Sequence, residues 1–420
     1  MSSPASLAGF QYDGRTLACD GVPLSAIAAE VGTPCYVYSA ASIRERYGAF
    51  VRAFASYPHA LHYALKANST LAVATLLRQL GAGADANSGG EIDVALRVGF
   101  RPSDIVFTGV GKTRDEIDKA VSLGLKAINA ESAGELERID AAARARGTRT
   151  RVALRVNPDI DAESHPKIST GLATNKFGLP ARDALAVLRA AVSREGLHIA
   201  GLHVHVGSQI RRIEPMRRAA QVAVDLALEL RRAGIEIEHL DLGGGLAIAY
   251  DDGPVPAVHE YCSALLSVVK PSGFPIIIEP GRAIVASAGV LLGRVVDLKP
   301  QTDDRYFVVL DAGMTELIRP ALYGAYHRVL PVQAVDTPRA TCDIVGPLCE
   351  TSDTIGEARE IPLPAIDSLM AIMDVGAYGA AMAFNYNRRL LAPEVLVEDG
   401  AWRVIRRRQT IDDLLALETP

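Results

Sequence analysis

The sequence has few of the residues that mark disulfide-rich or zinc-binding proteins. It contains only five cysteines in 420 residues, an odd number, widely spread and without any CxxC pair. This pattern argues against a disulfide framework and against a zinc cluster, and it fits a reducing, cytoplasmic location. The cysteines are Cys19, Cys35, Cys262, Cys342 and Cys349.

The sequence also lacks a strong charge of one sign and long apolar runs. With 44 Lys and Arg against 49 Asp and Glu, the formal net charge is -5, so nucleic acid is not an expected partner. No apolar run reaches membrane-spanning length, and residues 1–14 lack the basic and apolar regions of a secretory signal. The sequence therefore predicts a soluble protein with no membrane partner.

Most of the chain alternates between strand-like and helix-like segments. Between Pro34 and Pro280, short apolar runs are separated by Ala- and Leu-rich amphipathic stretches. Strand and helix in strict turn favour a parallel α/β barrel of the TIM type over an open sheet, and we expect it at residues 36–284. The expected strands are CYVYS, LHYALKA, GADANS, DIVFTG, KAINAES, RVALRVN, IAGLHVHVG, EHLDLGGG and PIIIEPG.

The pattern changes after Arg282. Strand-like segments such as GVLLGRVVDLKP, RYFVVLDAG and LMAIMDVGAYG follow one another with few helical stretches between them. They predict a second, mainly antiparallel β domain. The opening segment FQYDGRTLACDGVPL resembles a hairpin that joins this domain, so we expect a discontinuous β domain of residues 9–35 and 285–420.

A lysine stands at the end of an apolar run in HYALKAN, residues 62–68. Lys66 is either a rim residue with its ammonium group in water or an amine held in a dry site for chemistry. Three other chemically active segments fall at predicted strand ends, where barrels of this type place their active sites. They contain His205, Gly243–Gly245 and Glu279.

The segment HVHVGSQ places His203 and His205 on one face of a strand. An HxH pair is one form of metal site, but no third or fourth ligand stands at matching spacing on another strand, so we predict no metal. His203 is then either a core histidine or part of the pocket. The ring of His205, nearer the strand end, is suited to stacking on a planar cofactor.

Three consecutive glycines follow an apolar strand in DLGGGL. Without side chains, the backbone N–H groups of Gly243, Gly244 and Gly245 can form a concave site for a phosphate, although a plain tight turn would use the same residues. The motif is neither GxGxxG nor GxxxxGK[ST], so neither a dinucleotide site nor a nucleotide P-loop is supported.

The segment EPGR adds a carboxylate and a guanidinium at another strand end. Glu279 can hold a proton on a basic partner, and Arg282 can bind a phosphate or carboxylate, although either residue alone could form a surface ion pair. An amine, a flat ring, a glycine turn, a carboxylate and an arginine on successive strands together predict a pocket for pyridoxal 5'-phosphate. Lys66 would be its Schiff-base lysine.

At this point the sequence resembles the fold-type III pyridoxal-phosphate decarboxylases. The motifs that carry the resemblance keep the family order over nearly the whole chain: YALKAN, SGGE, HVGSQI, DLGGGL, EPGR, RPALYGAYH, GPLCETSD and GAYGAAMAFNYN. The resemblance implies a barrel of the alanine-racemase type that carries the cofactor, together with a β domain. It also implies a homodimer whose active sites are shared between subunits.

The resemblance also implies roles for individual residues. Residues implied to bind the cofactor are Lys66, which forms the Schiff base, His205, which stacks on the ring, Ser208, Gly243, Gly244 and Gly245 at the phosphate, Glu279 at the ring nitrogen, and Arg282 and Tyr378. Asp85 stands where the family often has an acidic residue near the cofactor. Residues implied to contact the substrate are Arg282, Arg319, Tyr323, Tyr378 and, from the other subunit, Glu350, with Cys349 near the reacting carbon.

Glu279 favours decarboxylation over racemisation. A carboxylate keeps the ring nitrogen protonated, which helps the ring to absorb a carbanion, whereas an alanine racemase is expected to use arginine there. The resemblance implies action on meso-2,6-diaminopimelate, giving L-lysine and carbon dioxide in the last step of lysine biosynthesis. Arg282 and Arg319 could bind the distal carboxylate, and Glu350 the ammonium group.

Several alternatives remain open at this stage. The substrate could instead be ornithine, arginine or a carboxy-polyamine, although ornithine has no distal carboxylate for Arg319 to bind. Either Cys349 or Lys66 is a natural proton donor to the carbanion, although Cys349 could equally be a small buried hydrophobic residue. Tyr323 and Tyr378 could be ordinary aromatics at a domain interface.

Overall fold

The computed structural model describes residues 9–162, 165–168, 170–172, 174–251, 253–301 and 305–419. The chain divides into two compact units. The barrel unit comprises residues 46–248 and 254–283, and the β unit comprises residues up to Glu45, residues 249–253 and residues from Ile284 onward. Among the described residues, no helix is both long enough and apolar enough to cross a membrane.

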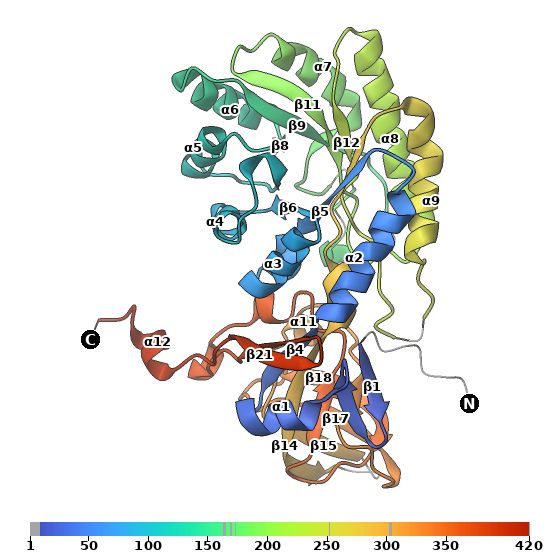
Figure 1. The fold of residues 1–420 in the computed structure, drawn as a ribbon, viewed down its shortest axis with the longest axis vertical. Coiled ribbons are helices and arrows are strands. Elements are labelled where there is room, and N and C mark those ends of the chain that lie inside the picture. The colour runs from blue at the N-terminus through green and yellow to red at the C-terminus, as the bar shows by residue number, and fades with distance from the viewer. Residues whose placement is uncertain are drawn as a thin grey trace. The chain divides into compact units, whose positions relative to one another are not determined.

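The strands of the barrel unit are parallel and close on themselves, as the sequence predicted (Figure 1). Closure is complete because β8 pairs with β9 and β13 pairs with β5, while the short β10 (Leu179–Pro180) adds to β9. In the described part of the chain the barrel strands are β5 (His59–Ala64), β6 (Gly83–Ala86), β7 (Ile105–Phe107), β8 (Ala127–Ala130), β9 (Thr150–Asn157), β11 (Leu197–Val204), β12 (His239–Asp241) and β13 (Ile276–Ile278).

Helices follow the strands and lie outside the barrel (Figure 1). Several begin at side-chain caps: the hydroxyls of Ser88, Thr113 and Ser132 accept the backbone N–H of the residue three positions on. Such caps stabilise the point where each loop turns into a helix. The helices are α2 (Ala40–Phe54), α3 (Leu71–Gln79), α4 (Gly89–Arg97), α5 (Arg114–Leu123), α6 (Ala133–Ala145), α7 (Ala181–Val192), α8 (Ile213–Arg232) and α9 (Val258–Val269).

The barrel interior changes from apolar to polar along the strands. An apolar cluster forms one interior layer, and two residues further along three of these strands the side chains are those of Asn129, Arg155 and Glu279, all buried. Because strand side chains repeat with a period of two, these groups share the interior face with the apolar layer. Charged and polar side chains therefore gather toward the C-terminal ends of the strands. The apolar layer consists of Val106, Ala127, Ala153 and Ile277, with Ala60 against it.

The β unit is a mainly antiparallel sheet, in agreement with the predicted second domain. Its strand order is β18-β17-β15-β14-β4-β20-β21, with β19 also paired to β14 and β16 paired to β19. The N-terminal segment forms the small antiparallel sheet β1 (Phe10–Asp13), β2 (Thr16–Cys19) and β3 (Val22–Pro23), followed by α1 (Leu24–Val31). The larger sheet consists of β4 (Cys35–Ser39), β14 (Gly289–Pro300), β15 (Arg305–Leu310), β16 (Val329–Pro331), β17 (Arg339–Val345), β18 (Thr354–Pro362), β19 (Leu369–Ile372), β20 (Glu394–Glu398) and β21 (Ala401–Arg406).

One predicted strand was assigned to the wrong sheet. The segment CYVYS was expected in the barrel, but as β4 it pairs antiparallel with β14 and parallel with β20, inside the β unit. All five of its residues are buried, which an apolar run can achieve in either kind of sheet. Its sequence therefore could not distinguish the two assignments.

Candidate active site

Lys66 lies in a single 3-10 turn, η1 (Leu65–Ala67), directly after β5. Its ammonium nitrogen donates to Asp85 Oδ2 at 3.0 Å and to Asn87 Oδ1 at 3.2 Å. The Lys66 side chain is 35% exposed, whereas Asp85 is fully buried. Because Asp85 lies in β6, the lysine points toward the end of that strand. Asn87 also donates to Asp85 Oδ1 at 2.9 Å, which fixes the carboxylate that faces the lysine.

His205 follows β11 and is partly buried. The backbone N–H of Gly244 donates to its Nδ1 at 3.3 Å, so this nitrogen is an acceptor and the ring is neutral. Burial, and next the ammonium group of Lys66, lower the pKa of His205 well below its ordinary value. A neutral ring held at one edge is suited to stacking on a planar group.

The three glycines after β12 stand where side chains cannot fit. Gly243 has φ of +64° and Gly245 has φ of +116°, both left-handed values that favour glycine. A Cβ on Gly243 would lie 2.7 Å from Nδ1 of His205, and one on Gly244 would lie 2.3 Å from the backbone oxygen of Glu279. The turn is therefore packed tightly between its neighbours, and the backbone N–H groups of Gly243 and Gly244 donate to Asp241 Oδ1 and His205 Nδ1.

Ser208 follows β11 and Arg282 follows β13, and their side chains contact each other. The Arg282 guanidinium donates to Ser208 Oγ through Nη2 at 3.0 Å and through Nε at 3.3 Å. Arg282 is buried, and a buried guanidinium next to a hydroxyl offers several donors for an anion.

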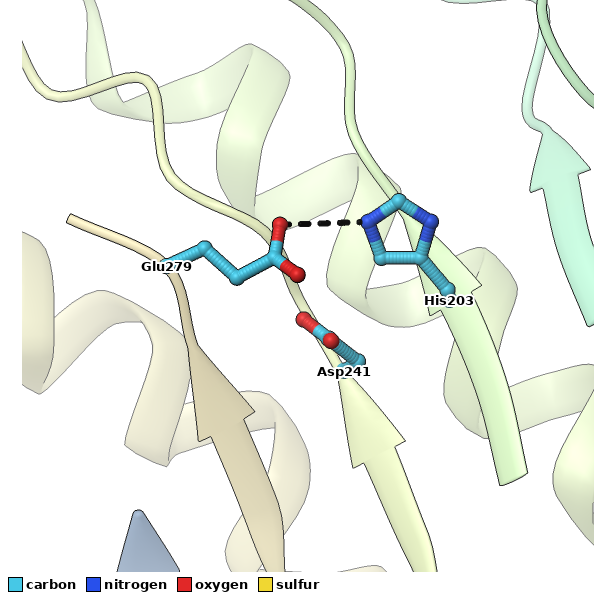
Figure 2. A group of neighbouring side chains, drawn as sticks. All are labelled: His203, Asp241 and Glu279. Atoms are coloured by element: carbon cyan, nitrogen blue, oxygen red, sulfur yellow. Dashed lines mark ion pairs between the residues drawn. The ribbon is translucent and has the colours of Figure 1, made fainter. Parts of the chain in front are cut away.

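Glu279 lies in a buried cluster with His203 and Asp241, and the three side chains point toward one another from neighbouring strand ends (Figure 2). The distance from His203 Nε2 to Glu279 Oε2 is 3.4 Å. From sequence spacing, no further metal ligand for His203 was expected on another strand. That expectation was wrong, because the fold brings the carboxyl groups of Asp241 and Glu279 beside His203. The candidate ligand atoms of all three residues lie within 4.8 Å of one another.

Arg319 is a predicted substrate residue that contacts two side chains within the β unit. It begins α11 (Arg319–Tyr323) and is buried, its Nη1 lies 2.7 Å from His327 Nε2, and its guanidinium lies 4.6 Å from the ring centre of Tyr250. His327 Nδ1 lies 2.8 Å from the carbonyl of Met373, so Nδ1 carries the proton and Nε2 accepts from Arg319.

The two predicted tyrosines are partly buried. Tyr323 ends α11, and Tyr378 has φ of +59°, a left-handed conformation that is costly for a bulky residue. Backbone strain of this kind is found preferentially at functional sites.

Cys349 and Glu350 are exposed on a loop of the β unit. Asp353, which is buried, closes this loop: its Oδ2 accepts from Leu348 N at 2.8 Å, and its backbone oxygen accepts from Gly346 N at 2.9 Å. The exposure of Cys349 removes the alternative that it is a small buried hydrophobic residue. Within the same unit, Tyr386 Oη donates to Glu350 Oε2 at 3.2 Å and Asn387 Nδ2 donates to Cys349 Sγ at 3.1 Å.

Residues 40–286 match the family model described as pyridoxal-dependent decarboxylase, pyridoxal binding domain. The chain belongs to the pyridoxal-dependent decarboxylases. It is 44% identical over 410 residues to a diaminopimelate decarboxylase of Pseudomonas aeruginosa, with 98% of each chain covered. The resemblance predicted from the motifs is thereby confirmed.

Solved structures of the family agree with the fold. The diaminopimelate decarboxylase of Helicobacter pylori complexed with L-lysine has a TM-score of 0.91 and 38% identity, covering 94% of this chain and 98% of that one. The enzyme of M. jannaschii in co-complex with L-lysine has a TM-score of 0.93 and 36% identity, with 98% of each chain covered. The barrel with an added antiparallel sheet is thus the fold of the family.

The sequence reasoning missed several residues that orient the predicted ones. Asn87 and Asp241 lie in barrel strands or just after them, where they look like ordinary strand-end polar residues. His327 and Asp353 occur within the motifs RPALYGAYH and GPLCETSD, so these motifs were the one available signal. Their partners are distant in sequence, and only folding shows that they act on Lys66, Glu279, Arg319 and the loop of Cys349.

Proposed function

We propose that this chain decarboxylates meso-2,6-diaminopimelate to L-lysine and carbon dioxide with pyridoxal 5'-phosphate as cofactor. The observation that carries the proposal is its likeness over nearly the full length to diaminopimelate decarboxylases, two of them solved with L-lysine bound. The reaction is the last step of lysine biosynthesis. The five cysteines are free thiols, four of them buried, which suits an enzyme of the reducing cytoplasm.

The residues at the barrel mouth fit the cofactor. Its phosphate suits the glycine turn, where no Cβ fits beside His205 and Glu279, together with the donors of Ser208 and Arg282. The buried Glu279 carboxylate suits a basic ring nitrogen, and the neutral ring of His205 suits its flat face. When bound, the cofactor supplies an electron-accepting ring that stabilises the carbanion left by loss of carbon dioxide.

Lys66 is the amine that holds the cofactor covalently. Asp85 and Asn87 orient its nitrogen from the neighbouring strand, so the amine has one defined direction. Its position at the end of an apolar strand keeps water away from one side. These two contacts hold the Lys66 nitrogen in place, and the amine becomes a nucleophile once it has lost a proton.

Glu279 remains ionised inside the barrel and holds a proton at the ring nitrogen. Burial alone would raise its pKa, but His203, Lys66 and Asp241 together lower it. An ionised carboxylate in a dry site favours the positive charge of a protonated ring nitrogen. This preference separates decarboxylation from racemisation in the family.

Residues of the β unit recognise the distal end of the substrate. Arg319 binds the distal carboxylate, because His327 and Tyr250 fix the plane of its guanidinium, and Tyr323 and Tyr378 line the same ligand. Glu350 would bind the distal ammonium group, and the Cys349 thiol would supply a proton at the reacting carbon, both in the active site of the other subunit of a homodimer. Their exposure on a closed loop supports this arrangement.

A substrate panel tests the proposal. Purified protein with pyridoxal phosphate should release carbon dioxide and L-lysine from meso-diaminopimelate, and it should act far more slowly on ornithine, arginine and carboxy-polyamines. Faster turnover of one of those amines would replace the proposed substrate. Stereochemically defined diaminopimelates in the same assay measure which centre is attacked.

The homodimer has its own test. Mixing an inactive Lys66→Ala chain with an inactive Cys349→Ala chain should restore part of the activity, because a mixed dimer then contains one intact shared site. Mixtures that stay as inactive as either variant alone would contradict a shared active site.

A further inference from the structure

Two buried carboxyl groups and a histidine meet at the ends of three adjacent strands. His203 and Asp241 are register partners between β11 and β12, and Asp241 pairs in turn with the strand that ends before Glu279. All three side chains are buried, and Figure 2 shows the Glu279 carboxyl between the histidine ring and the Asp241 carboxyl. The proposed function gives a role to Glu279 alone and leaves the other two without one.

The two carboxyl groups are arranged to share one proton. Asp241 Oδ1 accepts the backbone N–H of Gly243 at 3.0 Å, and Glu279 Oε2 faces His203 Nε2 at 3.4 Å. Among the described residues, no donor reaches the other oxygen of either group, Asp241 Oδ2 or Glu279 Oε1. A buried oxygen without a donor is costly, and two carboxyl groups whose oxygens lie within 4.8 Å of each other in a buried site favour a state with one proton between them.

The surroundings decide which group keeps the proton. Burial, and next the neighbouring Glu279, raise the pKa of Asp241 well above its ordinary value, whereas the pKa of Glu279 is lowered. Two nearby carboxyl groups commonly separate in this way, one ionised and one neutral. Asp241 is then the donor and Glu279 the acceptor.

We propose that Asp241 and His203 are positioning residues that hold the Glu279 carboxylate ionised and fixed in direction, so that it keeps a proton on the ring nitrogen of the cofactor. Asp241 donates to one oxygen and the histidine lies against the other, so the carboxylate cannot rotate. The inference rests on the proposed function, since that function assigns Glu279 to the ring nitrogen.

Other groups also act on Glu279 and set the conditions of any pH experiment. They come from β5, η1, β6, the end of β11 and α9, and each of them interacts electrostatically with this carboxylate. These groups are His62, Lys66, Asp85, His205 and Tyr261.

Two substitutions at Asp241 test whether this side chain acts as a hydrogen-bond donor or as an ionised carboxylate. Asp241→Asn keeps an N–H donor of the same shape as a protonated carboxyl group, whereas Asp241→Ala removes the donor. The readout is the low-field proton NMR signal of the protonated ring nitrogen, followed over pH in the holoenzyme, together with kcat and KM. Thermal unfolding of each holoenzyme shows whether the variants are folded.

We expect Asp241→Asn to keep the signal and nearly all of kcat. Asp241→Ala should lose the signal at lower pH than the parent and should lose about 100-fold in kcat with KM little changed, as misdirected catalytic groups do. His203→Ala should change the signal in the same direction. These three results together support the proposal.

Three other results would overturn it. One is an Asp241→Ala enzyme with the signal and kcat of the parent, and another is an Asp241→Asn enzyme as impaired as Asp241→Ala. The third is tight one-to-one zinc binding by the purified protein that His203→Ala abolishes, since the cluster would then be a metal site. Experiments on the parent protein distinguish this proposal from the proposed function. If the parent protein binds no cofactor, the proposed function fails. If diaminopimelate is not the substrate, the NMR signal of the ring nitrogen can still be measured.

Discussion

The ammonium nitrogen of Lys66 lies 3.0 Å from Oδ2 of the fully buried Asp85. The contact joins the end of β5 to the end of β6, and Asn87 completes it from the following loop. A lysine that could have been a rim residue is therefore held by two side chains from a neighbouring strand end.

Replacing this lysine should abolish covalent binding of the cofactor. We expect Lys66→Ala to show no visible absorbance band after addition of pyridoxal phosphate and gel filtration, because Lys66 supplies the amine that is held here for the carbonyl group. Lys119→Ala is the matched control, since Lys119 also pairs with a carboxylate and is similarly exposed, at 33%. A Lys66→Ala protein that kept the band would refute the assignment.

A methyl group on Gly244 should disturb both the fold and the cofactor site. Its Cβ would lie 2.3 Å from the backbone oxygen of Glu279, and neither backbone can move aside cheaply. We expect Gly244→Ala to lower the free energy of unfolding by about 1–3 kcal/mol, as overpacking does, and to weaken cofactor binding. Denaturant unfolding and cofactor titration measure the two effects.

Gly134→Ala is the control for this substitution. Gly134 lies in the first turn of α6, where a Cβ would be 3.7 Å from the nearest side-chain atom. Alanine there should leave the unfolding free energy unchanged or raise it by about 0.5–1 kcal/mol. Equal losses in the two variants would mean that the close approach at Gly244 is not the cause.

His62 should make the protein less stable in mild acid. Burial lowers its pKa from 6.5 to about 4, so between these values the unfolded chain binds a proton that the folded chain does not. The free energy of unfolding should therefore fall as the pH drops from about 6.5 to about 4, and His62 alone accounts for about 3 kcal/mol of the fall. Above the unfolded pKa the contribution is constant.

Denaturant unfolding over this pH range checks the contribution of His62. His62→Gln should show a shallower loss of stability toward low pH than the parent, whatever its stability at neutral pH. His259→Gln, at an exposed position, should keep the parent slope. A His62→Gln protein with the slope of the parent would show that another group is responsible.

Arg319 should affect substrate recognition and not cofactor binding. Lysine cannot keep both the contact with His327 Nε2 and the stacking on Tyr250, so Arg319→Lys should lower kcat/KM for diaminopimelate by about 10- to 100-fold, the value of one charge-assisted hydrogen bond. The visible band of the cofactor should be unchanged. Arg305→Ala, which removes a part-buried ion pair with Asp343, should leave kcat/KM as it is.

The fold was largely predictable because the barrel repeats one simple unit. Eight of the nine expected strands occur in the barrel in the predicted order, since alternating apolar runs and amphipathic stretches have few other solutions. The strand CYVYS is the exception, because the sequence of a fully buried apolar run does not indicate which strands it pairs with. Its place depends on pairing with β14 and β20, which are more than 200 residues away.

The sequence by itself determined which chemical groups stand at the strand ends: the amine of Lys66, the ring of His205, the glycine turn, and the carboxylate of Glu279. Motif order and strand periodicity are local properties, so they could be read without coordinates. Only the tertiary structure decided how these groups are held, because each is oriented by a residue from another strand or loop: Asp85 for Lys66, Gly244 for His205, and Asp241 and His203 for Glu279. Such contacts depend on strand register and barrel closure, which bring together residues whose separation along the sequence follows no motif.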